Sequence, residues 1–182
     1  MLEIRSNGTL SATGKTLHGY AAVFNSEANL GTFTEVIRPS AFAKSLASGS
    51  NIRALSNHDV NALVGTTRGG TLQLREDAKG LAFTLELPNT SHGRDLQELV
   101  SRGDVSGASF GFRVAPGGER WEQRNGQMVR ELLEVDLIEV TLTSDPAYVD
   151  TTVAMRAMPG KSFWETHTYL ETCDALWLET CK

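Results

Sequence analysis

The sequence predicts a mainly β protein with a few helices, an α+β chain organised as a barrel or a sandwich of short strands. Two observations support this fold class. Runs in which apolar and polar residues alternate recur along the chain, and Gly, Asn, Asp or Pro separate them. In the clearest run, Gly80 to Leu87, every second residue is a leucine or a phenylalanine. Many short strands of this kind are typical of barrels and sandwiches.

Short runs similar to this one predict the other strands. The predicted strands are Leu17 to Phe24, Phe33 to Ile37, Ile52 to Leu55, Thr71 to Arg75, Gly80 to Leu87, Gly107 to Val114 and Met128 to Thr143. The sequence contains no internal repeat and no low-complexity tract.

Helices are predicted in two places within this pattern. The first is Ser40 to Ser48, with Ser40 as its N-cap and Gly49 at its end, and the second is Thr90 to Arg102, followed by Gly103. A third helix, from Ser162 to Leu178, follows the Met158-Pro159-Gly160 break. We therefore expect one β domain over residues 1–157 and a C-terminal tail, helical in part, over residues 158–182.

The amino-acid composition is typical of a globular protein and argues against nucleic-acid and membrane partners. Among 182 residues, 40% are hydrophobic and 21% are charged, which is ordinary for a globular chain with a sizeable core. The net charge is -5, and no Lys/Arg cluster would follow a phosphate backbone, so we expect no nucleic-acid partner. No apolar run is long enough to cross a bilayer and no signal peptide is recognisable, so we expect no membrane association and a role inside a cell.

Three separated residues supply the groups of a serine hydrolase. His58 provides a base, Ser109 a nucleophile and Glu139 an acid that orients the base. Their order along the chain, His then Ser then acid, differs from the orders of the chymotrypsin, subtilisin and α/β-hydrolase designs. The sequence therefore predicts a different scaffold for this chemistry.

Strand parity constrains where these side chains point. From Gly107 to Val114, Ala108, Phe110 and Phe112 share one face, so Ser109 points to the other. From Met128 to Thr143, the same parity would turn Ile138, Val140 and Leu142 inward and leave Glu139 and Thr141 on the opposite surface. We therefore expect Ser109 and Glu139 to share the outer wall of the sheet.

Each member of the trio has a competitor in the sequence. The Asn57-His58-Asp59 segment is also typical of a simple turn, and Ser106 lies close enough to compete with Ser109 as the nucleophile. Glu131, Glu134 and Asp136 lie near Glu139, and the last two are its rivals as the acid. A zinc site built from His18, His58, Asp59 and His92 is not expected, because their spacing matches no known hydrolytic zinc motif.

The residues from about Leu17 to Ala154 resemble the prohead, or capsid maturation, proteases of tailed double-stranded DNA bacteriophages. The motifs that support this resemblance are Gly19 to Phe24, Glu35 to Phe42, Asn57-His58-Asp59 with Val64-Gly65, Ser109 to Phe112, and Glu139 to Tyr148. Each motif alone is weak, whereas their order and spacing together are specific.

The resemblance implies a fold similar to the herpesvirus assembly protease, a small closed β-barrel flanked by two or three helices. It implies a serine endopeptidase with His58 as base, Ser109 as nucleophile and Glu139 as the third member, acting without a metal or another cofactor. The implied partners are the major capsid protein and the scaffolding protein or scaffolding domain, cleaved inside the procapsid in the host cytoplasm. Self-cleavage and homo-oligomerisation are compatible with the resemblance.

Two other functions are compatible with the same fold. One is a non-catalytic capsid-assembly module that binds capsid or scaffold chains, although such a module has no need for the trio. The other is a small-molecule esterase, which the absence of a Gly-x-Ser-x-Gly elbow disfavours.

Overall fold

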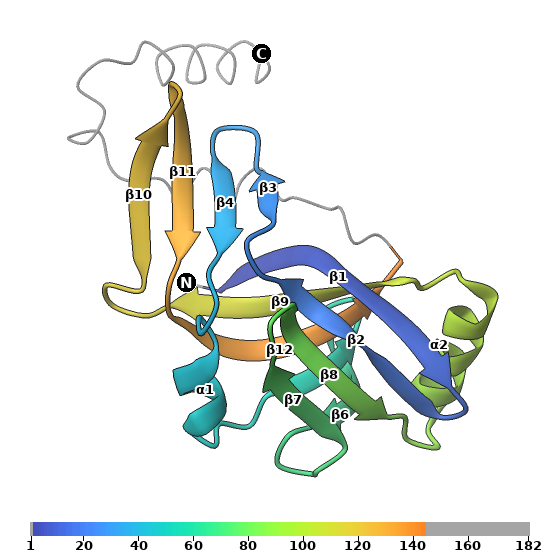
Figure 1. The fold of residues 1–182 in the computed structure, drawn as a ribbon. Coiled ribbons are helices and arrows are strands. Elements are labelled where there is room, and N and C mark those ends of the chain that lie inside the picture. Colours follow the sequence, from blue (N-terminus) through green and yellow to red (C-terminus); the bar gives the residue numbers. More distant parts are fainter. Residues whose placement is uncertain (1, 145–182) are drawn as a thin grey trace, which may run out of the picture.

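The computed structural model describes residues 2–144, and these form two β-sheets with a helix at either end of the larger one (Figure 1). The strands are β1 (Glu3–Thr13), β2 (Thr16–Val23), β3 (Glu27–Asn29), β4 (Thr34–Ile37), β5 (Arg53–Ser56), β6 (Asp59–Thr66), β7 (Leu72–Glu76), β8 (Gly80–Glu86), β9 (Gly107–Val114), β10 (Glu119–Arg124), β11 (Gln127–Leu132) and β12 (Val135–Thr143). The helices are α1 (Ala43–Ala47) and α2 (Ser91–Arg102).

The larger sheet has eight strands in the order β6-β5-β12-β9-β1-β2-β8-β7 and curls into a nearly closed barrel. Its two edges approach each other where β6 ends and β7 begins. There the Thr66 N–H donates to the Thr71 hydroxyl over 3.1 Å, and Gly65 leaves space for the side chain of Leu85. The predicted mainly β, barrel-like fold is therefore confirmed.

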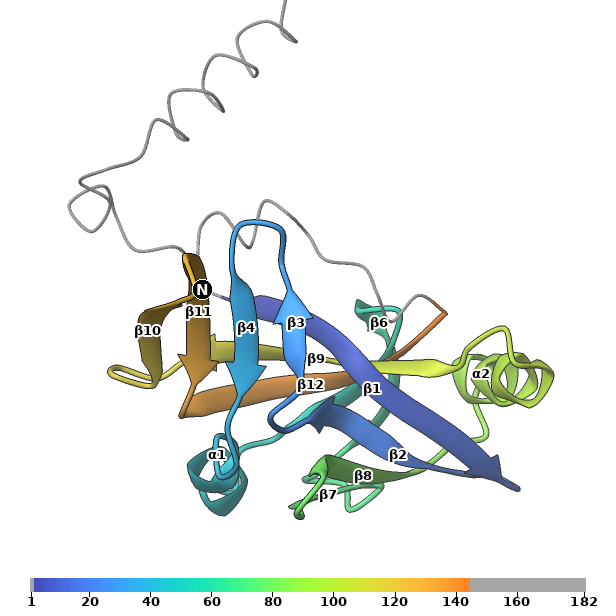
Figure 2. The same ribbon diagram turned by 45° about the horizontal axis from the view of Figure 1, so that its top comes forward.

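The smaller sheet has four strands in the order β10-β11-β4-β3 and stands beside the barrel (Figure 2). Sequence patterning did not indicate it, because the stretch predicted as one strand from Met128 to Thr143 is two strands in different sheets. The break is fixed by the Gly118 carbonyl, which accepts from the backbone N–H groups of Leu133 and Glu134 over 2.7 and 3.0 Å. The turn is not evident in the sequence, because apolar residues lie on both sides of it.

Aromatic residues of β9 fill the barrel as their parity predicts. Phe110 and Phe112 are fully buried and stacked, with ring centroids 5.2 Å apart. Phe110 also contacts Phe42 edge to face at 5.4 Å. Burial of such rings contributes much of the hydrophobic stabilisation of a core. It also fixes which face of β9 points away from the core.

The two described helices differ in how well the sequence predicts them. Helix α2 begins after Thr90, whose hydroxyl accepts from the Gly93 N–H, and ends at the left-handed Gly103, as predicted. Helix α1 is shorter than predicted, and Ser40 is not its N-cap. Ser40 has a φ of 72°, so the chain turns there and the helix begins only after Phe42. The predicted third helix and the boundary at residue 157 lie outside the described residues.

Four strands were absent from the prediction: β1, β3, β6 and β10. The most consequential is β1, which lies between β9 and β2 in the middle of the larger sheet. Its sequence, with Ser, Asn and Gly at positions 6 to 8, is typical of a turn. A register shift between Ser6 and Gly8 accommodates these residues within the strand.

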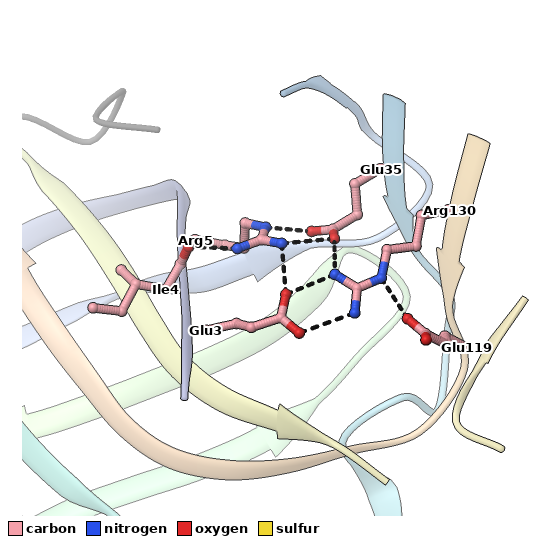
Figure 3. A network of polar contacts seen from close by, with 6 residues as sticks. All are labelled: Glu3, Ile4, Arg5, Glu35, Glu119 and Arg130. Atoms are coloured by element: carbon pink, nitrogen blue, oxygen red, sulfur yellow. Dashed lines mark hydrogen bonds and ion pairs between the residues drawn. The ribbon is translucent and has the colours of Figure 1, made fainter. Parts of the chain in front are cut away.

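A network of buried charges joins β1 to the smaller sheet (Figure 3). Arg5 donates to Glu35 of β4 over 2.5 Å, and Arg130 of β11 donates to Glu3 and Glu35 over 2.6 and 3.0 Å. Arg130 also donates to Glu119 of β10 over 2.6 Å. Burial by itself raises the pKa of Glu3. The hydrogen bonds and charges of Arg130 and Arg5 have the larger combined effect, so the pKa lies below its ordinary value. The network therefore holds charged side chains in a buried interface between the sheets.

Replacing Arg130 with methionine is expected to destabilise the protein by about 3–5 kcal/mol, because Glu3 and Glu35 would be left buried without an adequate counter-charge. Urea unfolding followed by circular dichroism measures this loss. Lys44→Met is the matched control, since its exposed pair with Glu134 is worth about 0–1 kcal/mol. Equal losses in the two variants would contradict the proposed importance of the network.

A second buried carboxylate, Glu131, accepts hydrogen bonds from Arg38, Arg120 and Arg124. Burial raises its pKa, but the hydrogen bonds and charges of these arginines outweigh burial and bring it to about 2 from an ordinary 4.5. The folded-state pKa lies below the unfolded one. Glu131 therefore stabilises the fold fully above about pH 4.5, and this contribution disappears as the pH falls toward 2.

Glu131→Gln is therefore expected to reduce the stability difference between neutral and acidic solution. Free energies of unfolding measured at several pH values between 7 and 2 should differ most between wild type and variant at neutral pH and converge on acidification. A constant difference across this range would argue against an ionised Glu131 in the folded state.

Candidate active site

His58 lies in a two-residue hairpin turn between β5 and β6. Asn57 and His58 have φ values of 50° and 57°, as a type I′ turn requires, and Ser56 pairs with Asp59 across it. The Asn57 N–H donates to the Leu142 carbonyl over 3.0 Å, which ties the turn to the end of β12. The segment is thus a turn, as its composition suggested, and one whose position is fixed beside β12.

Ser109 lies in β9 on the face opposite Phe110, directly across from Thr141 of β12. Its predicted direction is therefore confirmed. Although it lies on the outer face of the sheet, Ser109 is not exposed to solvent, since its exposed fraction is 0%. Other groups cover this part of the sheet, so a polar residue on the side away from the core is nevertheless buried.

Glu139 reaches the same face through a β-bulge in β12. The pairing of β12 with β9 shifts between Leu137 and Glu139, so Ile138 is the extra residue. The prediction that Ile138 points inward is wrong, since Leu137 and Val140 are the members of the core on either side of the bulge. Parity from Glu139 onward is as predicted, and Glu139 is only 3% exposed.

The structure brings the three predicted residues together. The His58 Nδ1 lies 2.7 Å from Glu139 Oε1, and its Nε2 lies 2.7 Å from Ser109 Oγ. One tautomer fits both contacts: Nδ1–H donates to the carboxylate, and Nε2 accepts from the serine hydroxyl. The His58 side chain is 25% exposed, so the imidazole is the part of the trio that solvent reaches. This arrangement can transfer a proton from the hydroxyl to the imidazole.

Two further residues hold Glu139 in place. Arg53 of β5 lies directly opposite it in register, with a guanidinium nitrogen 3.5 Å from Oε2. On the other side, Gly111 of β9 provides the space that the Glu139 side chain occupies, because a Cβ there would lie 2.8 Å from its Cγ. Arg53 was not among the predicted site residues. The arginine belongs to a strand whose register with β12 no local pattern reveals.

The competitors of the trio lie elsewhere. Ser106 is exposed and precedes β9. Glu134 accepts from Lys44 over 2.5 Å, and Asp136 is exposed opposite Arg113. The side-chain partners of His58 are the predicted serine and glutamate.

The remaining histidines of the described part do not join this site. His18 contacts Thr84 at 3.3 Å, and His92 is exposed in the first turn of α2. Among residues 2–144, no group of three or more His, Cys, Asp or Glu side chains is arranged to hold a metal ion. No helix within that range has the length and apolar character needed to cross a bilayer.

Comparison with known proteins shows to which family the chain belongs. The model that describes the caudovirus prohead serine proteases matches residues 1–163. The chain belongs to this family. The resemblance found in the sequence motifs is thereby confirmed.

Two individual proteins are similar to this member of the prohead protease family, one in sequence and one in structure. The prohead protease of Enterobacteria phage HK97 is 36% identical over 99 residues, which are 53% of this chain and 41% of that protein. The chain thus spans well under half the length of this relative. The capsid assembly protease of bacteriophage T4 matches in structure with a TM-score of 0.53 at 9% identity, over 78% of this chain and 96% of that one. At this identity the second likeness shows the fold alone.

The substitution Gly111→Ala tests whether the position of Glu139 controls the reactivity of Ser109. The added methyl group would displace the carboxylate, and a shift of about 1 Å in such an array costs up to about 100-fold in rate. We expect Ser109 to react with a fluorophosphonate probe about 10- to 100-fold more slowly, as measured by mass spectrometry over time. Circular dichroism checks that the variant is folded, and an unchanged labelling rate would count against this role.

Proposed function

We propose that this chain is the serine endopeptidase of capsid maturation, with Ser109 as nucleophile, His58 as general base and Glu139 as the orienting acid. The observation that supports the proposal most directly is the continuous pair of 2.7 Å contacts from Glu139 through His58 to Ser109. Family membership supports the reaction class, because the matching family is one of serine proteases. Exposed Ser106 and the ion-paired Glu134 have no comparable arrangement.

In the proposed mechanism, His58 Nε2 accepts the hydroxyl proton of Ser109 as Oγ attacks the scissile carbonyl. Ionised Glu139 accepts from Nδ1–H, which fixes the tautomer and stabilises the imidazolium that forms. His58 then donates the proton to the departing amine and an acyl-enzyme remains. Water, deprotonated by the same imidazole, releases the second product and restores the hydroxyl.

Access to the nucleophile requires a local movement. Ser109 has no exposed surface in this structure, whereas a scissile carbonyl must come within about 3–3.5 Å of Oγ to react. The groups that cover it must therefore shift when a substrate binds. The His58 side chain lies against Oγ and is 25% exposed, so a rotation of the imidazole is feasible while the backbone of the β5–β6 turn stays in place.

The substrates we propose are capsid-related polypeptides. The similar HK97 protein is a prohead protease and the structurally similar T4 protein is a capsid assembly protease, and these names support the proposal. For this chain we propose cleavage of the scaffolding protein, or of the scaffolding domain of the major capsid protein, and of the protease itself. The reaction would take place inside the procapsid in the host cytoplasm, before DNA is packaged.

Co-expression with the major capsid protein tests this function. We expect the wild-type chain to shorten the capsid or scaffold polypeptide, and Ser109→Ala, His58→Ala and Glu139→Gln each to slow this by at least about 10³-fold. Ser106→Ala and Glu134→Gln are the matched controls and should retain cleavage. Mass spectrometry of the shortened polypeptides measures the products.

Shortening that persists in Ser109→Ala and His58→Ala would contradict the proposed chemistry. A wild-type chain that binds the capsid protein without shortening it, and whose Ser109 resists a fluorophosphonate probe, would instead favour the non-catalytic assembly module.

A further inference from the structure

The segment that follows His58 in the sequence exposes two large apolar side chains. Val60 is 62% exposed and Leu63 is 45% exposed. Among residues 2–144, the other large hydrophobic residues with comparable exposure are Leu2 and Leu133, in separate parts of the chain. Val60 and Leu63 both belong to β6, an edge strand of the larger sheet. Apolar surface of this kind next to a reactive site is typical of a binding surface.

A large bulge presents these side chains. Ser56 pairs with Asp59 and Leu55 pairs with Leu63, so residues 60–62 of β6 have no counterpart on β5. The Asp59 carboxylate accepts from the backbone N–H of Asn61 over 2.8 Å and from its side-chain amide over 3.1 Å. The bulge is therefore held in shape by its own hydrogen bonds. Bulges next to active sites commonly serve to re-aim a side chain.

Register places Leu63 on the same side of the sheet as Ser109. Leu63 lies opposite Leu55, Leu55 opposite Thr141, and Thr141 opposite Ser109. Directly opposite residues on neighbouring strands project from one face. Three strand spacings of about 4.8 Å separate Leu63 from Ser109, a span of about 14 Å. An extended polypeptide covers that distance with about four residues.

Val60 lies closer to the reacting groups. It is two residues from His58, so their Cα atoms are at most about 7 Å apart. Its side chain is the most exposed of the large hydrophobic residues in the described part of the chain. A substrate chain bound at Ser109 and extending over β6 would therefore contact Val60 nearer the scissile bond and Leu63 farther from it.

We propose that Val60 and Leu63 form the subsite that binds a large apolar side chain of the polypeptide substrate, within about four residues of the scissile bond. The assignment rests on the proposed peptidase function and names the substrate feature that the enzyme selects. Val60 and Leu63 are specificity-determining residues and take no part in the proton transfers. Burial of an aliphatic substrate side chain against them, which removes apolar surface of both partners from water, supplies the selectivity.

Cleavage kinetics of single variants test the subsite. We expect Val60→Asp and Leu63→Asp each to lower kcat/KM for the capsid-derived polypeptide by about 10-fold or more, since one mismatched group in an apolar pocket costs about 10- to 200-fold. Val60→Thr, which preserves shape, should give a smaller loss in the same direction. Leu133→Asp is the matched control, because Leu133 is 38% exposed in the turn between β11 and β12. It should leave kcat/KM unchanged.

A second measurement separates this inference from the proposed function. A small fluorophosphonate reports on Ser109 without needing the subsite, so the Val60 and Leu63 variants should be labelled at the wild-type rate while cleaving the polypeptide slowly. In a second set of substrates, the apolar residues that flank the scissile bond are replaced by aspartate one at a time. At one of these positions, the replacement should lower kcat/KM of the wild-type enzyme but not that of the Leu63→Asp variant.

Three results would overturn the subsite. Wild-type kcat/KM in both aspartate variants would show that the patch does not contact substrate. A change from dimer to monomer in those variants, measured by light scattering, would assign the patch to a second copy of the chain. Wild-type protein that neither labels nor cleaves would reject the peptidase function and the subsite with it.

Discussion

The register of β12 between β9 and β5 is the constraint on which the candidate site depends. Antiparallel pairing places Thr141 opposite Ser109, and parallel pairing on the other side places Arg53 opposite Glu139. The same strand accepts the backbone hydrogen bond that ties the His58 turn to Leu142. A shift of one residue in this register would send Glu139 to the opposite face of the sheet and separate it from His58. The hydrogen bonds of the trio are thus a consequence of main-chain pairing.

The bulge at Ile138 and the absence of a side chain at Gly111 complete this arrangement. The bulge switches the side of β12 that faces the core, so that Leu137 lies inside before it and Val140 after it. Glu139 can then turn onto the face of Ser109, across the space that Gly111 leaves. The carboxylate is buried there, yet it has an imidazole at one oxygen and a guanidinium near the other. These two contacts compensate for the hydration that the carboxylate loses on burial.

The charge network between the sheets has a structural role distinct from the site. Glu3 and Arg5 belong to β1, which also pairs with β9 and so lies next to the strand of Ser109. Through Glu35 and Arg130 the same strand is joined to β4 and β11. The orientation of the smaller sheet relative to the barrel therefore depends on hydrogen bonds of defined geometry, in addition to apolar packing.

Several features were predictable from sequence because they depend on local periodicity. The alternation in β8 and β9, the caps of α2 and the inward direction of Phe110 all follow from neighbours in the chain. Other features were not. The polar residues of β1 form a strand only because β9 and β2 lie on either side. The segment from Met128 to Thr143 divides between two sheets at a turn whose backbone N–H groups donate to the carbonyl of Gly118, a residue distant in the sequence.

By itself the sequence determined the chemical inventory: a serine, a histidine and a carboxylate, each on an element whose type its neighbours specify. Only the tertiary structure decided that these groups meet within 2.7 Å, that Arg53 and Gly111 hold the acid in place, and that Val60 and Leu63 remain uncovered beside them. The physical reason is that strand register and bulges depend on hydrogen bonds between residues far apart in the chain. Local periodicity sets the side to which a residue points, whereas pairing between strands sets its neighbours.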